Sequence, residues 1–593
     1  MALSSGPFFA DRSQYTTVLR TLAKVQRETP DLKRTLTACK TLGRQINAQV
    51  SIKENPMPIG TKVPDKATAD RLLHAYLEIY EGPFRVLHIP SFRAAYDEYY
   101  SQPRSASIIF ILQLQICMAL GSITCEDSLA WKSAASQWLM EAQMWLHQSI
   151  VRTRQRLTFE HLQLACLICL YEASISGTDH VHYCWTQAGD LYRKAMCLGL
   201  HRDPDWEGTL SLRQAEMRRR LWVTILEVNL LLALQAGRPV MITASDYDTL
   251  PPSNLDDEEL CDNLQREIDM QQRIDPHRPT ATTMQLLLHA SFDLRLKITC
   301  KINNFANETS YDEVLQFHSH LSEAQSHIRK RNAELATYVE NDDTRITPYH
   351  MKIVEMLTSR FILALHLPGI GKSIKDPVFH FSRRICFMTS LRFMETWEIG
   401  SSLRQQRGIT SMPRLRLRLL LVNNQGFLRH IAIQAMFSIL LELVTHKEEQ
   451  QAHSDPLAVS DEEELVQNAV WIQNWAEDQI RAGSTDVRTY CFITSCIAYA
   501  QALGSKSETR NIDQVIADAA LNCNNKCFEL MSGVAAGLDH FDQGTQSVLA
   551  GEMEMTSFGL ADEESFADTM GSTEYDWTLS LDPFRQTDWN LIL

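Results

Sequence analysis

The chain has 593 residues, of which 45% are hydrophobic and 22% charged, and its formal net charge is −15 at pH 7. This apolar content suffices for a large buried core and excludes a chain that is disordered throughout. Because 23 glycines and 20 prolines are few for this length, the many turns of a sandwich or barrel are disfavoured, and the sequence predicts an all-α, multi-helical fold.

The first 59 residues predict one or two helices, followed by a loop. Apolar residues recur at steps of three and four on either side of Pro30, which separates the two runs. These residues are Leu19, Leu22, Val25, Leu32, Leu36, Cys39, Leu42 and Ile46. A loop rich in proline follows at 55–60, and a further helix is expected over 67–81.

Three strongly apolar stretches follow, at 108–120, 161–171 and 223–234, and polar residues interrupt the first and last of them. None reaches the roughly 18 to 20 continuous apolar residues that a bilayer crossing needs. The N-terminal residues do not resemble a secretory signal. We therefore expect a protein of the cytosol or nucleus that has no membrane partner.

The middle of the chain predicts a helical hairpin over 158–200, with its turn at 176–178. Gly177 and Gly199 stand where helix ends favour glycine. Ser211 and Gln214 form the sequence signature of a capping box, so the next helix should begin there and run to about Gln235.

Helical periodicity resumes after a connection rich in proline and aspartate at 246–257 and continues to about residue 445. A surface break over 447–456 precedes a second capping box at Ser460 and Glu463, and the last helices are expected to end before about 545.

The C-terminal residues combine acidic and aromatic side chains. From 551 to 593 there are ten acidic residues and one basic residue, which leaves −6 of the total charge of −15 for the other 550 residues. That near-neutral body has no broad basic surface for nucleic-acid phosphates. The aromatic residues of the tail include Phe566, Trp577, Phe584 and Trp589. This composition predicts a disordered activation segment, and a docked C-terminal helix or strand is the alternative.

The fourteen cysteines do not predict a metal centre. The pair Cys166 and Cys169 lies in apolar helical text without a second pair nearby, and Cys523 and Cys527 have the same character. We expect buried thiols, no bound metal and no cofactor.

Three charged motifs invite a functional interpretation, but a structural role is favoured for two of them. His201 and Asp203 could support acid–base chemistry, yet no nucleophile accompanies them. The triplet 218–220 could be an import signal or phosphate clamp, but it is expected to pair with Asp203, Asp205 and Glu216. Residues 329–331 are the better import candidate.

The acidic run 256–259 superficially resembles the metal-binding motifs of helical terpenoid synthases. Because it follows a double proline in polar text, we expect a solvated loop there. No catalytic residue is assigned.

Four segments between residues 82 and 259 together resemble the middle homology region of fungal zinc-cluster transcription factors, the fungal-specific transcription factor domain. Because the four segments occur in the family's order and spacing, together they indicate the family more strongly than any single segment does. The residues that carry it are His88, Pro90 and Phe92; Gly189, Gly199, Leu200, His201 and Arg202; Arg219, Arg220 and Trp222; and Gly237, Arg238 and Pro239.

The resemblance implies an all-helical regulatory domain whose shared residues are structural. In the family a separate module with six cysteines and two zinc ions contacts DNA, and only Cys39 precedes Cys117 in this chain. The expected organisation is linker helices at 1–59, a regulatory domain at 60–445, a surface linker at 446–462, further helices of the body at 463–545 and the activation tail at 546–593.

The resulting hypothesis is a nuclear transcription regulator, not an enzyme, that activates a fungal metabolic or secondary-metabolite gene set. Its expected partners are coactivators that bind the tail, with a second copy or a full-length zinc-cluster factor also possible, and DNA binding by this chain alone is doubtful. The alternatives are a co-regulator that does not bind DNA and an all-helical small-molecule sensor or enzyme.

Overall fold

The computed structural model describes the chain from residue 16 to residue 549, with gaps. The gaps are 51–58, 61, 104–105, 150–155, 178–179, 207–209, 261–277, 305–308, 340–344, 375, 398–411, 425, 452–461 and 505–510. The acidic tail, with Phe566, Trp577, Phe584 and Trp589, lies outside the described residues, and so does the capping serine predicted at 460.

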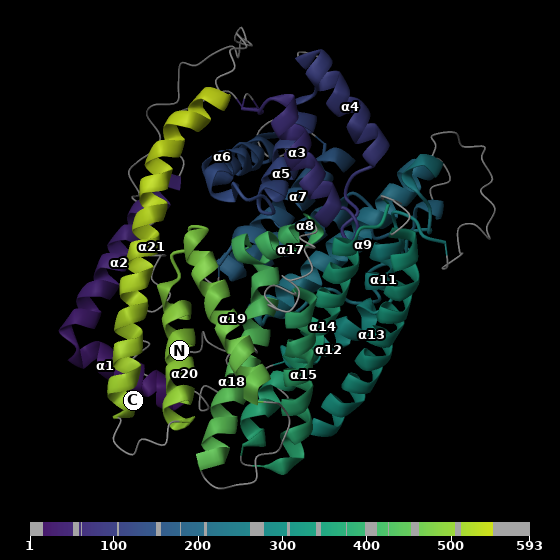
Figure 1. Cartoon of the computed structure of the whole chain (residues 1–593). Helices are drawn as coiled ribbons and strands as arrows, with labels where there is room; N and C mark the ends of the chain where they lie inside the picture. Colours follow the sequence, from purple (N-terminus) through teal and green to yellow (C-terminus); the bar gives the residue numbers. More distant parts are fainter. Residues whose placement is uncertain are drawn as a thin grey trace, which may run out of the picture.

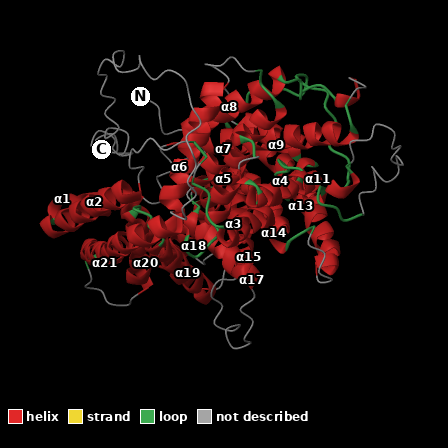
Figure 2. Ribbon diagram, turned by 90° about the horizontal axis from the view of Figure 1, so that it is seen from above, coloured by secondary structure: helices red, strands yellow, loops and turns green. Residues whose placement is uncertain are grey.

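In the described ranges every regular element is a helix, which confirms the predicted all-α class (Figures 1 and 2). The helices are α1 (Thr16–Glu28), α2 (Pro30–Val50), α3 (Lys66–Ile79), α4 (Ile89–Ser101), α5 (Ile108–Ser122), α6 (Ser128–His147), α7 (Phe159–Ile175), α8 (Val181–Cys197), α9 (Leu212–Ala236), α11 (Thr283–His289), α12 (Phe292–Ile302), α13 (Tyr311–Val339), α14 (Pro348–Ser373), α15 (His380–Trp397), α17 (Met412–Asn423), α18 (Phe427–Gln451), α19 (Glu462–Arg481), α20 (Val487–Gly504) and α21 (Ile512–Leu549). Short 3₁₀ turns occur at Pro204–Trp206, Asp257–Glu259 and Pro377–Phe379.

Local sequence signals set the ends of the central helix α9. The Ser211 hydroxyl accepts from the Gln214 backbone N–H at 3.3 Å, and the Ser211 N–H donates to the Gln214 side chain at 3.0 Å, so the predicted capping box is present. At the other end Gly237 adopts the left-handed conformation, with φ 60°, which costs glycine little.

The two glycines of the predicted hairpin differ. Gly199 has a positive φ of 80° after α8, as its position predicted. Gly177 is not among the described glycines with positive φ, because α7 ends on Ser176 in an extended conformation. The turn exists, but the prediction that it needs the backbone freedom of Gly177 was wrong.

Helix α9 is buried along nearly its whole length and contacts α7, α8, α11, α12 and α18. Trp222 has no exposed surface, and its ring stacks on Tyr192 of α8 with 5.4 Å between centroids. This contact confirms the prediction that Trp222 packs against the preceding hairpin.

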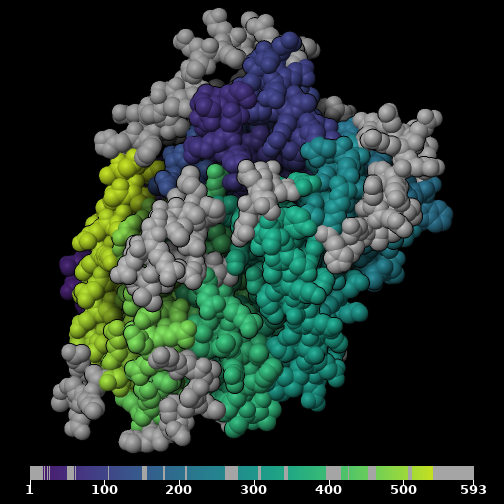
Figure 3. All heavy atoms as spheres, turned by 45° about the vertical axis from the view of Figure 1, so that its right-hand side comes forward, coloured from purple at the N-terminus to yellow at the C-terminus, as the bar shows by residue number. Residues whose placement is uncertain are grey.

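The first two helices pack against the last ones. The α1–α2 pair contacts α20 and α21, and Figure 1 shows the purple helices beside the yellow α21. The Cys39 thiol donates to the Asn524 carbonyl at 3.4 Å, and Lys24 pairs with Asp513 at 2.7 Å. In Figure 3 the purple residues between α2 and α5 form one end of the molecule, above the teal and green helices.

Helix α18 extends to Gln451, so the helix ends later than the surface break predicted to begin at Lys447. Lys447 is only 8% exposed and pairs with Glu462 of α19, which explains why polar sequence remains helical there.

Two helices, α14 and α18, are long and apolar enough to cross a membrane by length and composition alone. However, 72% of the most apolar 18-residue stretch of α14 and 89% of that of α18 is buried inside the fold. Their apolar surface is therefore used by the core.

Candidate functional site

Most of the segments that carry the family resemblance meet around the N-terminal half of α9, whereas Gly237, Arg238 and Pro239 follow its C-terminal end. Two groups of mostly buried residues, linked by ion pairs and hydrogen bonds, join them. We call them the Asp257 cluster (Glu81, Arg85, His88, Ile89, Arg220, Asp257) and the Asp203 cluster (Asp203, Asp205, Glu216, Arg219).

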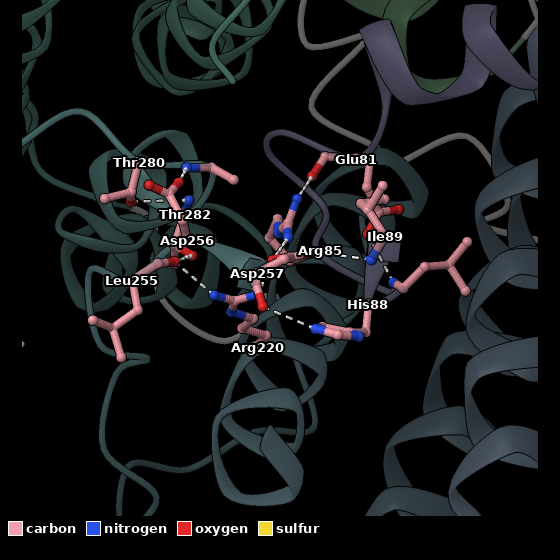
Figure 4. Close-up of polar contacts among 12 residues, drawn as sticks. Glu81, Arg85, His88, Ile89, Arg220, Leu255, Asp256, Asp257, Thr280 and Thr282 are labelled. Atoms are coloured by element: carbon pink, nitrogen blue, oxygen red, sulfur yellow. Dashed lines mark hydrogen bonds and ion pairs between the residues drawn. The ribbon is translucent and has the colours of Figure 1, made fainter. Parts of the chain in front are cut away.

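Asp257 lies between two arginines from distant parts of the chain (Figure 4). Its Oδ1 accepts from Arg220 Nη1 at 2.6 Å and also from Arg85, while Oδ2 accepts from the backbone N–H of Ile89 at 2.8 Å. Burial by itself raises the pKa of this carboxyl, but the charges of Arg85 and Arg220 outweigh it and hold the pKa well below its usual range. Asp257 is therefore ionised and paired.

His88 adds a further link between α4 and the same loop. Its Nδ1 lies 2.7 Å from the Ser91 hydroxyl at the start of α4, and its Nε2 lies 3.0 Å from the Asp257 carbonyl oxygen. Pro90 occupies the first turn of α4, where a missing N–H costs nothing, and the ring of Phe92 packs 5.2 Å from Phe110. The His88, Pro90 and Phe92 motif thus fixes the entry of α4.

Glu81 organises the turn before α4. One of its oxygens accepts from the backbone N–H groups of Val86 and Leu87, at 2.9 and 2.7 Å, and the other accepts from the Tyr76 hydroxyl. Neighbouring Gly82 permits close packing, because a Cβ there would lie 2.4 Å from the His350 ring.

The acidic run 256–259 is not the solvated loop that the sequence predicted. Asp256 and Asp257 are 5% and 3% exposed, and Glu258 is the exposed member of the run. Asp256 accepts from the Ala281 N–H at 2.8 Å and from Arg345 at 2.9 Å, while its own N–H donates to Glu259. Basic side chains and backbone donors that are distant in sequence surround these carboxylates, and for this reason a polar run after two prolines becomes buried.

The Asp203 cluster contains the pairing predicted for the arginine triplet. Arg219 forms a two-point contact with Asp203, through Nε at 3.0 Å and Nη2 at 2.7 Å, and its Nη1 donates to Glu216 at 2.9 Å. Nη2 also lies 2.9 Å from Asp205. The partners predicted from proximity in the sequence are confirmed for Arg219, whereas Arg218 donates to the Leu198 carbonyl oxygen at 2.8 Å.

The connection after α9 closes over this cluster. The Leu250 N–H donates to Asp203 at 3.0 Å, and the Ser253 N–H donates to Glu216 at 2.8 Å. Arg202 pairs with Asp248 at 2.9 Å, and the Asp248 N–H donates to the His201 carbonyl oxygen. Leu200 has an exposed fraction of 0%, which places the end of the hairpin in the core.

The remaining motif residues join α9 to its neighbours through the backbone. Asn303 donates to the Arg238 carbonyl oxygen at 2.7 Å, and Trp185 donates to that of Pro239 at 3.2 Å. Gly189 lies within α8, where a Cβ would meet only the end of the Arg193 side chain, at 3.3 Å.

The carboxylates of both clusters except Glu81, which bonds Tyr76 and two backbone N–H groups, are paired with arginines, and all but Asp205 are at most 7% exposed. Paired groups of this kind hold distant segments of the chain together. The sequence failed to indicate Arg85 and Asp257 as partners, since 172 residues separate them. The available signal was an arginine in an otherwise apolar turn.

Four buried histidines make the stability of the fold depend on pH. Burial lowers the pKa of His289 and His350 to about 4 and that of His366 and His430 to about 3. These rings stay neutral in the folded chain, whereas each takes up a proton near pH 6.5 when the chain unfolds.

Glu81 and Glu172 act in the opposite direction, because burial raises the pKa of each to about 7 and the folded chain keeps their protons. For these six groups together, the unfolded chain therefore binds about two more protons than the folded chain between about pH 4.5 and 6.5. We expect the free energy of unfolding to fall as the pH drops through this window, by roughly 3 kcal/mol per pH unit. Urea denaturation across the window measures it.

His350→Gln should reduce that slope by the contribution of about one proton, because it removes one of the four buried rings. A free energy of unfolding that rises on acidification would contradict the assignment of neutral buried rings.

Comparisons with known proteins agree with the geometry. The family described as "Fungal specific transcription factor domain" matches residues 73–369, a range that contains both clusters. Transcription factor opdR of Penicillium oxalicum is 30% identical over 494 residues, which cover 79% of this chain and 60% of the relative.

Two further relatives match over shorter ranges. Transcription factor lepE of Aspergillus flavus is 29% identical over 64% of this chain and 45% of its own length. The aspyridones cluster regulator apdR of Emericella nidulans is 28% identical over 62% of this chain and 48% of its own length. The chain thus spans about half to three fifths of the length of these curated relatives. No solved structure matches it.

Proposed function

Because the chain belongs to the fungal specific transcription factor domain family, we propose that it regulates transcription in the nucleus of a fungus and activates a secondary-metabolite gene set. The observation that carries this proposal is the family match over the residues that form both buried clusters. The printed name of apdR, a cluster regulator, supports the choice of gene set.

In this proposal the helical body is a rigid support. The Asp257 and Asp203 clusters fix four segments around α9, and none of their paired carboxylates is offered to a reacting group. Regulation then depends on contacts with partner proteins.

We place activation in the acidic-aromatic tail, with coactivators as its partners; because α21 continues to Leu549, the tail begins after that residue and not at 546 as the sequence predicted. Repulsion among ten carboxylates is screened beyond about 8 Å at physiological ionic strength, so charge alone does not give a specific contact. Specific binding has to come from the rings, each of which buries roughly 150 to 250 Å². Ordering a disordered ligand costs about 2 to 5 kcal/mol, so two or three rings must bind together.

Transcript profiling of a strain that lacks this chain tests both parts of the proposal. We expect a group of biosynthetic transcripts to fall, and the wild-type chain to restore them. The triple variant Trp577→Ala, Phe584→Ala, Trp589→Ala should restore less than about a tenth of the wild-type transcript level. This holds if removal of the rings costs more than about 1.4 kcal/mol of coactivator binding free energy.

The matched control replaces three carboxylates of the same tail, Glu563→Gln, Glu564→Gln and Asp568→Asn, and should only weaken activation. A transcript profile that does not respond to loss of the chain would refute the regulatory function. Full restoration by the triple aromatic variant would refute only the role of the tail.

A further inference from the structure

Arg360 carries a buried positive charge that has no counter-charge among the described residues. It lies on α14, has no exposed surface and faces α9 and α18. Its one hydrogen bond is a long one, from Nη1 to the Leu231 carbonyl oxygen at 3.5 Å. Nε and Nη2 have no hydrogen-bond partner. Burial lowers the pKa of Arg360 to about 9, so the guanidinium stays charged at neutral pH.

The other deeply buried arginines of the described chain are paired. Arg220 has Asp257, Arg295 has Glu227 and Arg383 has Glu442. A buried charge without a partner is strongly destabilising, whereas a hydrogen-bonded pair offsets most of that cost. Within the described residues, a carboxylate accompanies each of these buried guanidinium groups, and Arg360 is the exception.

The free edge of Arg360 has a specific geometry. Arg219 and Arg383 both bind a carboxylate through Nε and Nη2, with distances of 3.0 and 2.7 Å to Asp203 and of 2.7 and 3.0 Å to Glu442. This edge presents two parallel N–H groups that match the two oxygens of a carboxylate. The same edge of Arg360 lacks any acceptor.

The surroundings of Arg360 also favour an anion. His430 and the adjacent Arg429 lie on α18, and besides burial the positive charges of Arg360 and Arg429 both lower the pKa of the His430 ring. Arg429 has its own partner, Asp486, at 2.8 Å. No carboxylate is among the groups that influence Arg360.

We propose that the interior between α9, α14 and α18 binds a small organic acid, whose carboxylate accepts hydrogen bonds from Nε and Nη2 of Arg360. Because three helices cover Arg360, the acid enters only when they separate. Binding should therefore stabilise the closed body, as any ligand specific to the folded state does. The body would then respond to a small metabolite, independently of how the chain acts on transcription.

Thermal unfolding of the complete chain tests this proposal, with sodium acetate, succinate and citrate as probes against sodium chloride at equal ionic strength. We expect at least one carboxylate to raise the melting temperature by about 2 °C or more beyond chloride, and Arg360→Met to abolish that rise. Without any probe, Arg360→Met should melt at or above the wild-type temperature, because it removes a buried charge that lacks a partner.

Arg295→Met is the matched control, since it leaves Glu227 buried without its partner and should melt well below the wild type. Arg360→Lys keeps the charge but not the paired N–H groups, so it should lose most of the response to carboxylates.

Carboxylates that stabilise wild type and Arg360→Met equally, or not at all, overturn the proposal. So does an Arg360→Met variant that is destabilised as strongly as Arg295→Met. If stabilisation depends on Arg360 but occurs only with sodium phosphate and with none of the carboxylates, the site binds phosphate, and the proposal of a carboxylate ligand is overturned.

Discussion

Asp257→Ala is expected to destabilise the body by about 3 to 5 kcal/mol or more, because it leaves Arg85 and Arg220 buried without their shared partner. The change also removes the acceptor of the Ile89 N–H, which helps to hold the start of α4. Urea denaturation followed by circular dichroism measures the loss, as a fall in the midpoint of unfolding.

The neighbouring carboxylate provides the control. Glu258 is exposed, so Glu258→Ala should change the free energy of unfolding by less than about 0.5 kcal/mol although it removes the same charge from the same turn. Adding Arg85→Met and Arg220→Met to Asp257→Ala should recover part of the loss, because the charges without partners are then gone. Equal midpoints for Asp257→Ala and Glu258→Ala would show that the cluster contributes nothing to stability.

Trp222→Ala should cost about 3 to 5 kcal/mol, the range for removing a large aromatic side chain from a core. The ring has no exposed surface, stacks on Tyr192 and meets the edge of Tyr247 at 5.6 Å. Its indole N–H has no partner in the described part of the chain, so the loss comes from the cavity and not from a broken hydrogen bond.

Trp206→Ala is the matched control, since Trp206 is 76% exposed and lies just before α9. It should shift the free energy of unfolding by less than about 0.5 kcal/mol. A melting temperature of Trp222→Ala that equals the wild-type value would contradict the place of Trp222 in the core.

Much of the candidate site follows from short-range sequence signals. The partners of Arg219 could be predicted because Glu216 lies one helical turn away and Asp203 lies 16 residues away at the end of the preceding hairpin. The start of α9 followed from Ser211 and Gln214, and its end from Gly237. These contacts depend on backbone geometry that the residues impose on their own neighbourhood.

The burial of Asp257 could not be predicted in this way. Sequence reasoning assigned 256–259 to solvent because charges after prolines usually remain solvated, and only the fold brings Arg85 from 172 residues away. Arg295 and Glu227 illustrate the same limit, since 68 residues separate two charges that meet in the core at 2.8 Å. A buried ion pair is stable only when both partners arrive together, and neither local pattern shows that they will.

The sequence by itself determined that this chain is helical, where α9 begins and ends, and that four segments share a family pattern, because periodicity, caps and motif spacing depend on nearby residues. Only the tertiary structure decided that α1 and α2 pack on α21, as in the pair of Lys24 and Asp513, 489 residues apart. It alone decided that Arg220, Arg295 and Arg383 meet a carboxylate and that Arg360, among the described residues, does not. The physical reason is that contacts between distant segments depend on the path of the whole chain, which no local pattern encodes.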